Sequence, residues 1–273
     1  MPALLSPSGL TSVHALLLLA DGRFPAGGHA HSAGIEAAVN DGRVTDVASL
    51  VAFAEGRLRT VGLVDISFAM ATAVHLGPSG PTEREELGPS GPTEREELGP
   101  SGPSEREVPS RASDAVAARR LLGRLDAEVD ARTPAPPLRA ASRRLGRQLL
   151  RVGTRCWPSA LLALAAEGAY DPHQSVAFGL VGLAAGLGVE DIGDLVAHHN
   201  LTIPMQAGVR MLGLDPFAVA AASAALAGVA ADVVAAAGSF ATGPIEALPA
   251  RSATLIDLAA MTHAGADGRL FAT

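Results

Sequence analysis

The chain has 273 residues, 48% of them hydrophobic, one cysteine and a formal net charge of −7. A chain of this length can bury a full hydrophobic core. The excess of acidic residues argues against a nucleic-acid-binding protein, which usually presents a net basic surface, and the single cysteine excludes an internal disulfide framework. We therefore expect a cytoplasmic chain that binds proteins or small ligands.

Helical periodicity runs through most of the sequence, where alanine and leucine outnumber the β-branched and aromatic residues that strands favour. We predict an all-α fold, with a single domain built as a bundle of about ten helices. From Asp46 to His75, apolar side chains recur with i, i+3, i+4 spacing and predict one long amphipathic helix. The other helices, bounded by glycine and proline, are expected at residues 10–20, 32–40, 112–129, 138–153, 159–168, 173–187, 190–212, 216–238 and 252–263.

A tandem repeat interrupts this pattern. The string GPSGPTEREEL occupies residues 77–87, recurs identically at 88–98, and returns as GPSGPSEREV at 99–108. Each unit has two prolines and two glycines, which break helices, and almost no apolar residue to bury. We predict that residues 77–111 are a disordered loop within a single domain spanning residues 1–273.

The membrane is not an expected partner. The apolar run at residues 13–20 is too short to span a bilayer, and the N-terminus lacks the pattern of a signal peptide. Residues 216–238 approach spanning length, but they are mostly alanine and contain Asp232. A buried helix is favoured there, and a membrane-associated protein is the alternative.

Arginines form the clearest charge pattern. Arg139, Arg143, Arg147 and Arg151 recur every four residues and therefore lie along one face of the helix expected at 138–153. Such a ridge is usually solvated, although the planar guanidinium also suits docking against carboxylates of a partner.

The stretch GRFPAGGHAHSAGIE joins the first two expected helices. Pro25 fixes one backbone angle, Gly27 and Gly28 permit positive φ, and Ser32 is placed to cap the second helix. We predict a sharp turn between two helices, with no phosphate site, because the lysine and Ser/Thr of a P-loop are missing.

Two histidines in this stretch raise the possibility of a metal site. His29 and His31, with Asp21 or Glu36, would supply part of a ligand set, but no further ligand follows at zinc-like spacing. A hydrogen-bonding role at the turn is favoured, and we predict no metal, cofactor or catalytic residue. A histidine-based metal-binding protein or metalloenzyme remains the alternative.

The longer stretch LLLLADGRFPAGGHAHSAGIEAAVNDGRV, residues 16–44, resembles the N-terminal motif of the urease accessory protein F (UreF) family. The matching positions are Leu17, Ala20, Asp21, Phe24, Pro25, Gly27, Gly28, His31, Ser32, Gly34 and Glu36. The strings RRLGRQLLRV, HQSVAFGLVGLAAGLGV, IPMQAGVRMLGLDP and DLAAMTHAGADGRLF are similar to later blocks of the family, in the same order.

This resemblance implies a non-enzymatic, all-α accessory protein without a cofactor. Members of the family form homodimers and bridge a companion accessory protein, UreD or UreH, and the GTPase UreG on apo-urease, where nickel is inserted with GTP hydrolysis. The partner-binding residues that it implies are Phe24, Pro25, Gly27, Gly28, His31, Ser32, Gly34, Glu36, His263, Arg269, Leu270 and Phe271. We expect His31 and Glu36 to be accessible to solvent and to a partner. The tail departs from the family pattern at Thr262 and Ala264, where arginine and glutamate are usual.

Overall fold

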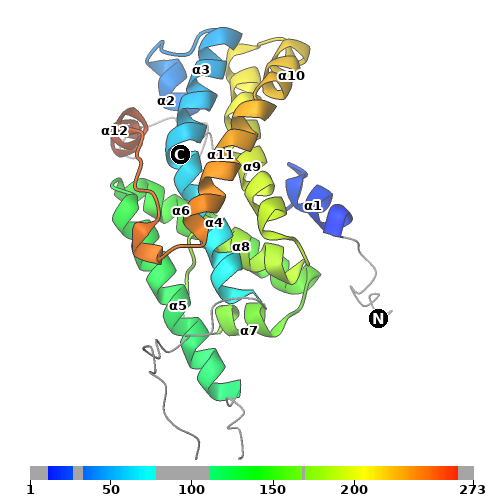
Figure 1. Cartoon of the computed structure of the whole chain (residues 1–273). Helices are drawn as coiled ribbons and strands as arrows, with labels where there is room; N and C mark the ends of the chain where they lie inside the picture. The colour runs from blue at the N-terminus through cyan, green and yellow to red at the C-terminus, as the bar shows by residue number, and fades with distance from the viewer. Residues whose placement is uncertain (1–11, 27–32, 78–110, 168–169, 264–273) are drawn as a thin grey trace, which may run out of the picture.

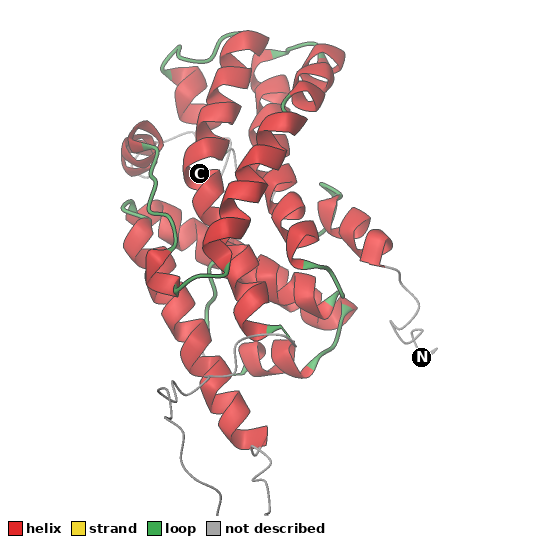
Figure 2. Ribbon diagram, in the orientation of Figure 1, coloured by secondary structure: helices red, strands yellow, loops and turns green. Residues whose placement is uncertain are grey.

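The structure, a computed structural model, describes residues 12–26, 33–77, 111–167 and 170–263 (Figure 1). Within these ranges all regular secondary structure is helical and no strand is present, which confirms the predicted all-α class (Figure 2). The elements are α1 (Ser12–Ala20), α2 (Ile35–Asn40), α3 (Val47–Arg57), the π-helical η3 (Leu58–Gly62), α4 (Leu63–Leu76), α5 (Arg111–Arg132), α6 (Pro136–Cys156), α7 (Ala160–Ala166), α8 (Gln174–Ala184), α9 (Val189–Leu212), α10 (Pro216–Ala225), α11 (Ala227–Ala241), the 3-10 segment η4 (Ile245–Ala247) and α12 (Thr254–His263).

Helix α4 forms the centre of the bundle. Its sequence LVDISFAMATAVHL is apolar on nearly every side, and a helix of that kind is stable only when other elements surround it. Accordingly, α4 packs against α8, α9 and α11, and most of its side chains, including Ile66 and Phe68, are fully buried (Figure 1).

The long helix predicted from Asp46 is present but changes its winding midway. Asp46 caps it, because its side chain accepts a hydrogen bond of 2.8 Å from the backbone N–H of Ser49. Between α3 and α4, the residues of η3 adopt a π-helical turn. Such turns are uncommon and often occur at functional sites, and the apolar spacing did not predict this one.

The prediction of a single helix at 216–238 is wrong. Helix α10 ends at Ala225, α11 begins at Ala227, and the two axes are bent by 42°. Leu226 is buried at the bend, so that apolar side chains of both helices can face the core. Much of the pair is exposed, Phe217 to 83%, and the buried-helix interpretation therefore holds only for its inner face.

A membrane span was tested on length and composition. No single described helix is long and apolar enough to cross a bilayer, whereas the bent pair α10–α11 taken together passes the same test.

The repeat region falls almost entirely outside the described residues. Helix α4 ends at Leu76 with Gly77 after it, and α5 begins at Arg111, so the predicted loop extended one residue too far into α5.

Candidate functional site

The turn after α1 carries the described first part of the N-terminal motif. Asp21 organises it, because its side chain accepts a hydrogen bond of 2.9 Å from the backbone N–H of Arg23. The backbone carbonyl of Asp21 accepts a second bond, of 2.8 Å, from the N–H of Phe24. This is the local pairing that favours Asp at turns, and it holds the chain in a compact loop.

This turn is attached to the C-terminal half of α6. The side chain of Gln148 donates a hydrogen bond of 3.1 Å to the carbonyl of Pro25. The ring of Phe24 lies 6.1 Å from that of Trp157, centroid to centroid, and both side chains are buried. Phe24 is therefore a packing residue, whereas Pro25 is exposed beside α6.

On its other side the turn meets a pair of histidines on α9. Nε2 of His199 lies 2.9 Å from the carbonyl oxygen of Leu19 at the end of α1. Burial lowers the pKa of His199, and of His198 beside it, so both favour the neutral ring, whose one N–H can donate a hydrogen bond to a carbonyl. The histidines therefore satisfy carbonyls at the end of α1.

A second polar group lies deeper, next to the π-helical turn. Arg57 precedes η3 and Asp65 follows it, and Arg57 donates a hydrogen bond of 3.3 Å to the backbone carbonyl of Asn200 on α9. Burial raises the pKa of Asp65 to about 6, although Arg57 and Asn200 act in the opposite direction. A cavity of about 40 Å³ lies beside these side chains and also touches His199.

We call Arg57, Asp65, His199 and Asn200 the interior polar cluster, and His198 is exposed beside it. Sequence reasoning missed the cluster, although His199 and Asn200 inside the long helix α9 were a signal that polar side chains point into the bundle. Among the described residues, no group of three or more His, Cys, Asp or Glu side chains is arranged to hold a metal ion. The cluster offers hydrogen-bond donors and acceptors, together with the carboxyl of Asp65, whose pKa burial raises to about 6.

The second part of the motif lies against α12. Gly34 has φ of 87° and forms the N-cap of α2, so the prediction that Ser32 caps this helix is wrong. A Cβ on Gly34 would lie 3.0 Å from the side chain of Ile256 on α12. Glycine suits this position because it tolerates positive φ and permits the close approach.

The expectation that Glu36 is accessible is also wrong. Its side chain is only 3% exposed, because α2 packs against both α9 and α12. Glu36 therefore belongs to the contact between the motif and helices α9 and α12. Replacing it would disturb this packing as well as any contact with a partner protein.

The last helix leaves an apolar stripe uncovered. Helix α12 buries Ile256 and exposes three side chains at i, i+3, i+6 spacing on another face. They are Leu255 at 60%, Leu258 at 50% and Met261 at 48% exposure. We call these three residues the α12 stripe.

The remaining expected site residues lie at the ends of the described ranges or outside them. His263 is the last residue of α12, but its side chain is outside the described part. Seven further residues lie outside the described ranges altogether: Gly27, Gly28, His31, Ser32, Arg269, Leu270 and Phe271. His29 is also outside these ranges.

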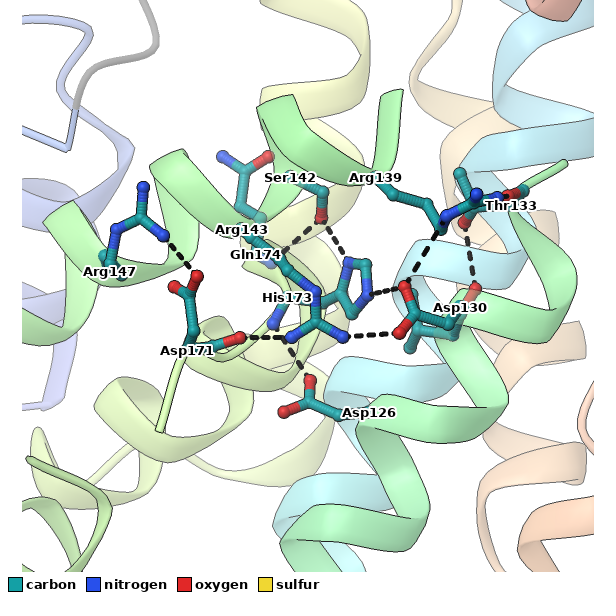
Figure 3. A network of polar contacts seen from close by, with 11 residues as sticks. Asp126, Asp130, Thr133, Arg139, Ser142, Arg143, Arg147, Asp171, His173 and Gln174 are labelled. Carbon is teal, nitrogen blue, oxygen red and sulfur yellow. Dashed lines mark hydrogen bonds and ion pairs between the residues drawn. The ribbon is translucent and has the colours of Figure 1, made fainter. Parts of the chain in front are cut away.

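A third polar group, the α6 network, joins α5, α6 and the start of α8 (Figure 3). Asp130 on α5 accepts hydrogen bonds from Arg143, at 2.6 Å, and from Nε2 of His173, at 2.9 Å. Burial acts to raise the pKa of Asp130, but these two donors hold it below its usual value.

His173 is the centre of this network and is fully buried. Its Nδ1 lies 3.0 Å from the hydroxyl of Ser142, and its backbone N–H donates a bond of 2.9 Å to Asp126. Burial lowers the pKa of His173, with Arg143 acting in the same direction and Asp130 opposing. A neutral ring, protonated at Nε2, satisfies both of its ring contacts.

The arginine ridge predicted from spacing therefore has internal partners along its first part. Arg139 and Arg143 contact Asp130, and Arg147 pairs with Asp171 (Figure 3). The hydroxyl of Ser142, the ring of His173 and the carboxylate of Asp130 form a chain of hydrogen bonds, but His173 is fully buried and Ser142 also accepts a hydrogen bond of 3.1 Å from the backbone N–H of Gln174. We interpret the arrangement as a structural network that fixes the helices to one another.

Comparisons with known proteins place the chain in a family. The UreF family model matches residues 44–227. The chain belongs to the UreF family. It is 37% identical over 222 residues to the urease accessory protein UreF of Mycolicibacterium vanbaalenii, a match covering 80% of this chain and 81% of the relative.

Two further UreF proteins match the chain, and one of them extends the match to nearly its whole length. The urease accessory protein UreF of Mycobacterium sp. strain JLS is 36% identical over 264 residues, covering 97% of this chain and 100% of the relative. That of Mycobacterium marinum is 35% identical over 212 residues, covering 77% and 78%. The resemblance first recognised in the N-terminal motif is thereby confirmed, and by family name the chain is an accessory protein rather than a catalytic one.

Proposed function

We propose that this UreF protein is a non-enzymatic scaffold of urease maturation. It forms a homodimer in the cytoplasm and bridges a companion accessory protein, UreD or UreH, and the GTPase UreG on apo-urease, for GTP-dependent insertion of nickel. Residues 1–273 act as one domain in this role. The partners come from the family resemblance, and the described surfaces supply the argument for where they bind.

The observation that carries the proposal is the α12 stripe beside the N-terminal motif. Leu255, Leu258 and Met261 are about half exposed on a helix whose opposite face contacts Gly34 of the motif. Apolar side chains that gather on one exposed helix face mark protein interaction sites more often than isolated ones do. A partner seated on α12 would also lie next to the expected site residue His263.

Helix α1 supports a second contact. It exposes Val13, Leu17 and Leu18, to 61%, 62% and 42%, while Leu19 is buried against the bundle. Because His199 and the turn at Phe24 hold the end of α1 in place, this face is presented in a fixed orientation. Helices α1 and α12 lie on opposite sides of the bundle in Figure 1, as a bridge between two partners requires.

A histidine-based metalloenzyme is not favoured. Three histidines of the described residues, His173, His198 and His199, hydrogen bond to protein groups and have lowered pKa values caused mainly by burial. They are used for structure.

The test is co-purification of the tagged chain, expressed together with the companion protein and the GTPase. We expect the wild-type chain to retain both. The double variant L255E/L258E should lose one of them, because two charges would be buried without partners. V116E is the matched control, since Val116 is also exposed, to 54%, but lies on α5.

Each outcome decides the proposal. Loss of a partner from the α12 variant alone, with an unchanged melting temperature, supports it. Retention of both partners by the α12 variant, or capture of neither by the wild-type chain, contradicts it.

A further inference from the structure

The second part of the arginine ridge lines a groove on the outer face of α6. The groove has a volume of about 450 Å³. It is lined by Pro25, Arg144, Arg147, Gln148, Arg151, Val152 and Arg155. Four of these seven residues are arginines and none is acidic, which makes the groove strongly basic on a chain whose net charge is −7.

Arg151 and Arg155 differ from the arginines that precede them on the helix. Both are exposed, and neither forms an ion pair with any carboxylate of the described residues, whereas Arg147 pairs with Asp171 at the edge of the groove. These two guanidinium groups are not needed to hold α6 on the bundle. Each retains its donors for a ligand, in the planar geometry that matches a carboxylate.

One wall of the groove comes from the N-terminal motif. Pro25 lies at its rim, and the bond from Gln148 to the Pro25 carbonyl fixes that wall against α6. The groove is therefore assembled from two separate parts of the chain rather than from one exposed helix face.

The length of the groove indicates the size of its ligand. Arg144 and Arg155 are eleven positions apart, so they span about 16 Å along the helix axis. An extended peptide covers that distance with roughly five residues. A single small anion would meet only one or two of the arginines.

We propose that this arginine groove binds an extended acidic segment of a partner protein, with carboxylates paired to Arg151 and Arg155. The inference rests on the proposed function, because we take the acidic segment to belong to a protein of the maturation complex. It goes further by naming the type of contact, which is pairing between carboxylates of the partner and arginines of this chain. A nucleic acid is the alternative ligand, and the net charge of −7 of the whole chain argues against it, because nucleic-acid-binding chains usually carry a net positive charge.

The test measures binding of a fluorescein-labelled peptide of alternating glutamate and aspartate, about eight residues long, to the full chain by fluorescence anisotropy. We expect the wild-type chain to bind it, and the R151E/R155E variant to bind at least about tenfold more weakly. Binding should also weaken as salt rises from about 50 mM to about 300 mM, because exposed charges are screened.

The control variant is R120E/R251E, which makes the same change of charge at two exposed arginines outside the groove. It should bind the peptide nearly as well as the wild-type chain does. R151K/R155K keeps the charge but loses the guanidinium fork, and we expect an intermediate affinity.

The inference is overturned if R151E/R155E and R120E/R251E weaken peptide binding equally. It is also overturned if the chain binds an uncharged peptide of glutamine and asparagine as tightly as the acidic one, or binds duplex DNA more tightly than the acidic peptide. The proposed function fails in a different experiment, the co-purification, if the wild-type chain captures no accessory protein. The peptide-binding assay tests the ligand of the groove independently of that result.

Discussion

The two ends of helix α6 present the same side chain in different settings. Arg143, near its beginning, donates to Asp130 and to the backbone carbonyl of Asp171, and its side chain is 26% exposed. Arg151 lies about two turns further along α6, in the same series of arginines at every fourth position. It is exposed in the groove and has no carboxylate partner among the described residues. Spacing along a helix therefore shows which face a residue occupies, but neighbouring elements decide whether that face is structural or available.

The difference lies in what covers each end. The first part of α6 meets α5 and the segment Asp171–Pro172–His173, which supply carboxylates and a buried imidazole (Figure 3). Removing one member there leaves buried polar atoms without partners, which is costly. The second part faces the groove, where water can replace a lost side chain.

The largest loss of stability is expected from adding a side chain at Gly146, where the first part of α6 closely approaches the backbone of Pro172. A Cβ on Gly146 would lie only 2.0 Å from the carbonyl oxygen of Pro172. We expect Gly146→Ala to lower the free energy of unfolding by about 3 kcal/mol or more, because the helix must move away from a backbone that cannot yield. Urea denaturation followed by circular dichroism measures this.

The matched control is Gly123→Ala on α5, where a Cβ would meet no atom within 4 Å. That substitution should raise stability by about 0.5 to 1 kcal/mol, because alanine favours the helix. Equal effects of the two substitutions would show that α6 is not held closely at Pro172.

The next largest effect is expected at the centre of the network. We expect His173→Gln to destabilise the protein by about 2 kcal/mol at neutral pH, because glutamine cannot reach both Ser142 and Asp130 from a fully buried position. Thermal and urea unfolding of the variant and the wild type measure the difference.

This difference should also depend on pH. The folded pKa of His173 is lowered below the ordinary histidine value of 6.5, so the unfolded chain binds the proton more readily. The contribution of His173 is therefore fully present above pH 6.5 and is lost as the pH falls toward the lowered folded value. We expect the gap between wild type and variant to narrow from pH 7.5 to about pH 5.5; a gap that widens would contradict a neutral, buried His173.

The smallest changes in stability are expected from replacing one arginine at each end of α6, which compares the two ends directly. Arg143→Ala should cost about 1 to 2 kcal/mol, because it removes a partly buried partner of Asp130. Arg151→Ala should change the free energy of unfolding by less than about 0.5 kcal/mol, as is usual for exposed side chains. Equal losses at both positions, measured by urea unfolding, would remove the distinction between network and groove.

Much of the helical architecture could be predicted from the sequence, because its signals are local. Helix α3 begins where the apolar spacing from Asp46 placed it, and the paired acids Glu190 and Asp191 lie in the first turn of α9. The bend at Leu226 was missed because alanine-rich sequence favours a helix on both sides of it, and core packing, which is not local, sets the break.

The candidate site was less predictable, because its contacts join residues far apart in the chain. His173 lies 47 positions from Asp126, and His199 lies 180 positions from Leu19. Glu36 appeared accessible on a short polar helix, yet α12, more than two hundred residues later, lies close to the motif that contains it. The apolar character of α12 was visible in the sequence, whereas which of its faces stays uncovered was not.

The central claim is that this UreF protein bridges the GTPase to the urease complex, and size-exclusion chromatography with light scattering tests it most directly. Apo-urease, the companion accessory protein and the GTPase are mixed with GTP and magnesium, with and without this chain. We predict that the GTPase co-elutes with apo-urease only when the chain is present, and less so with L255E/L258E. Co-elution of the GTPase without the chain, or its absence from the complex when the wild-type chain is bound, would contradict the account.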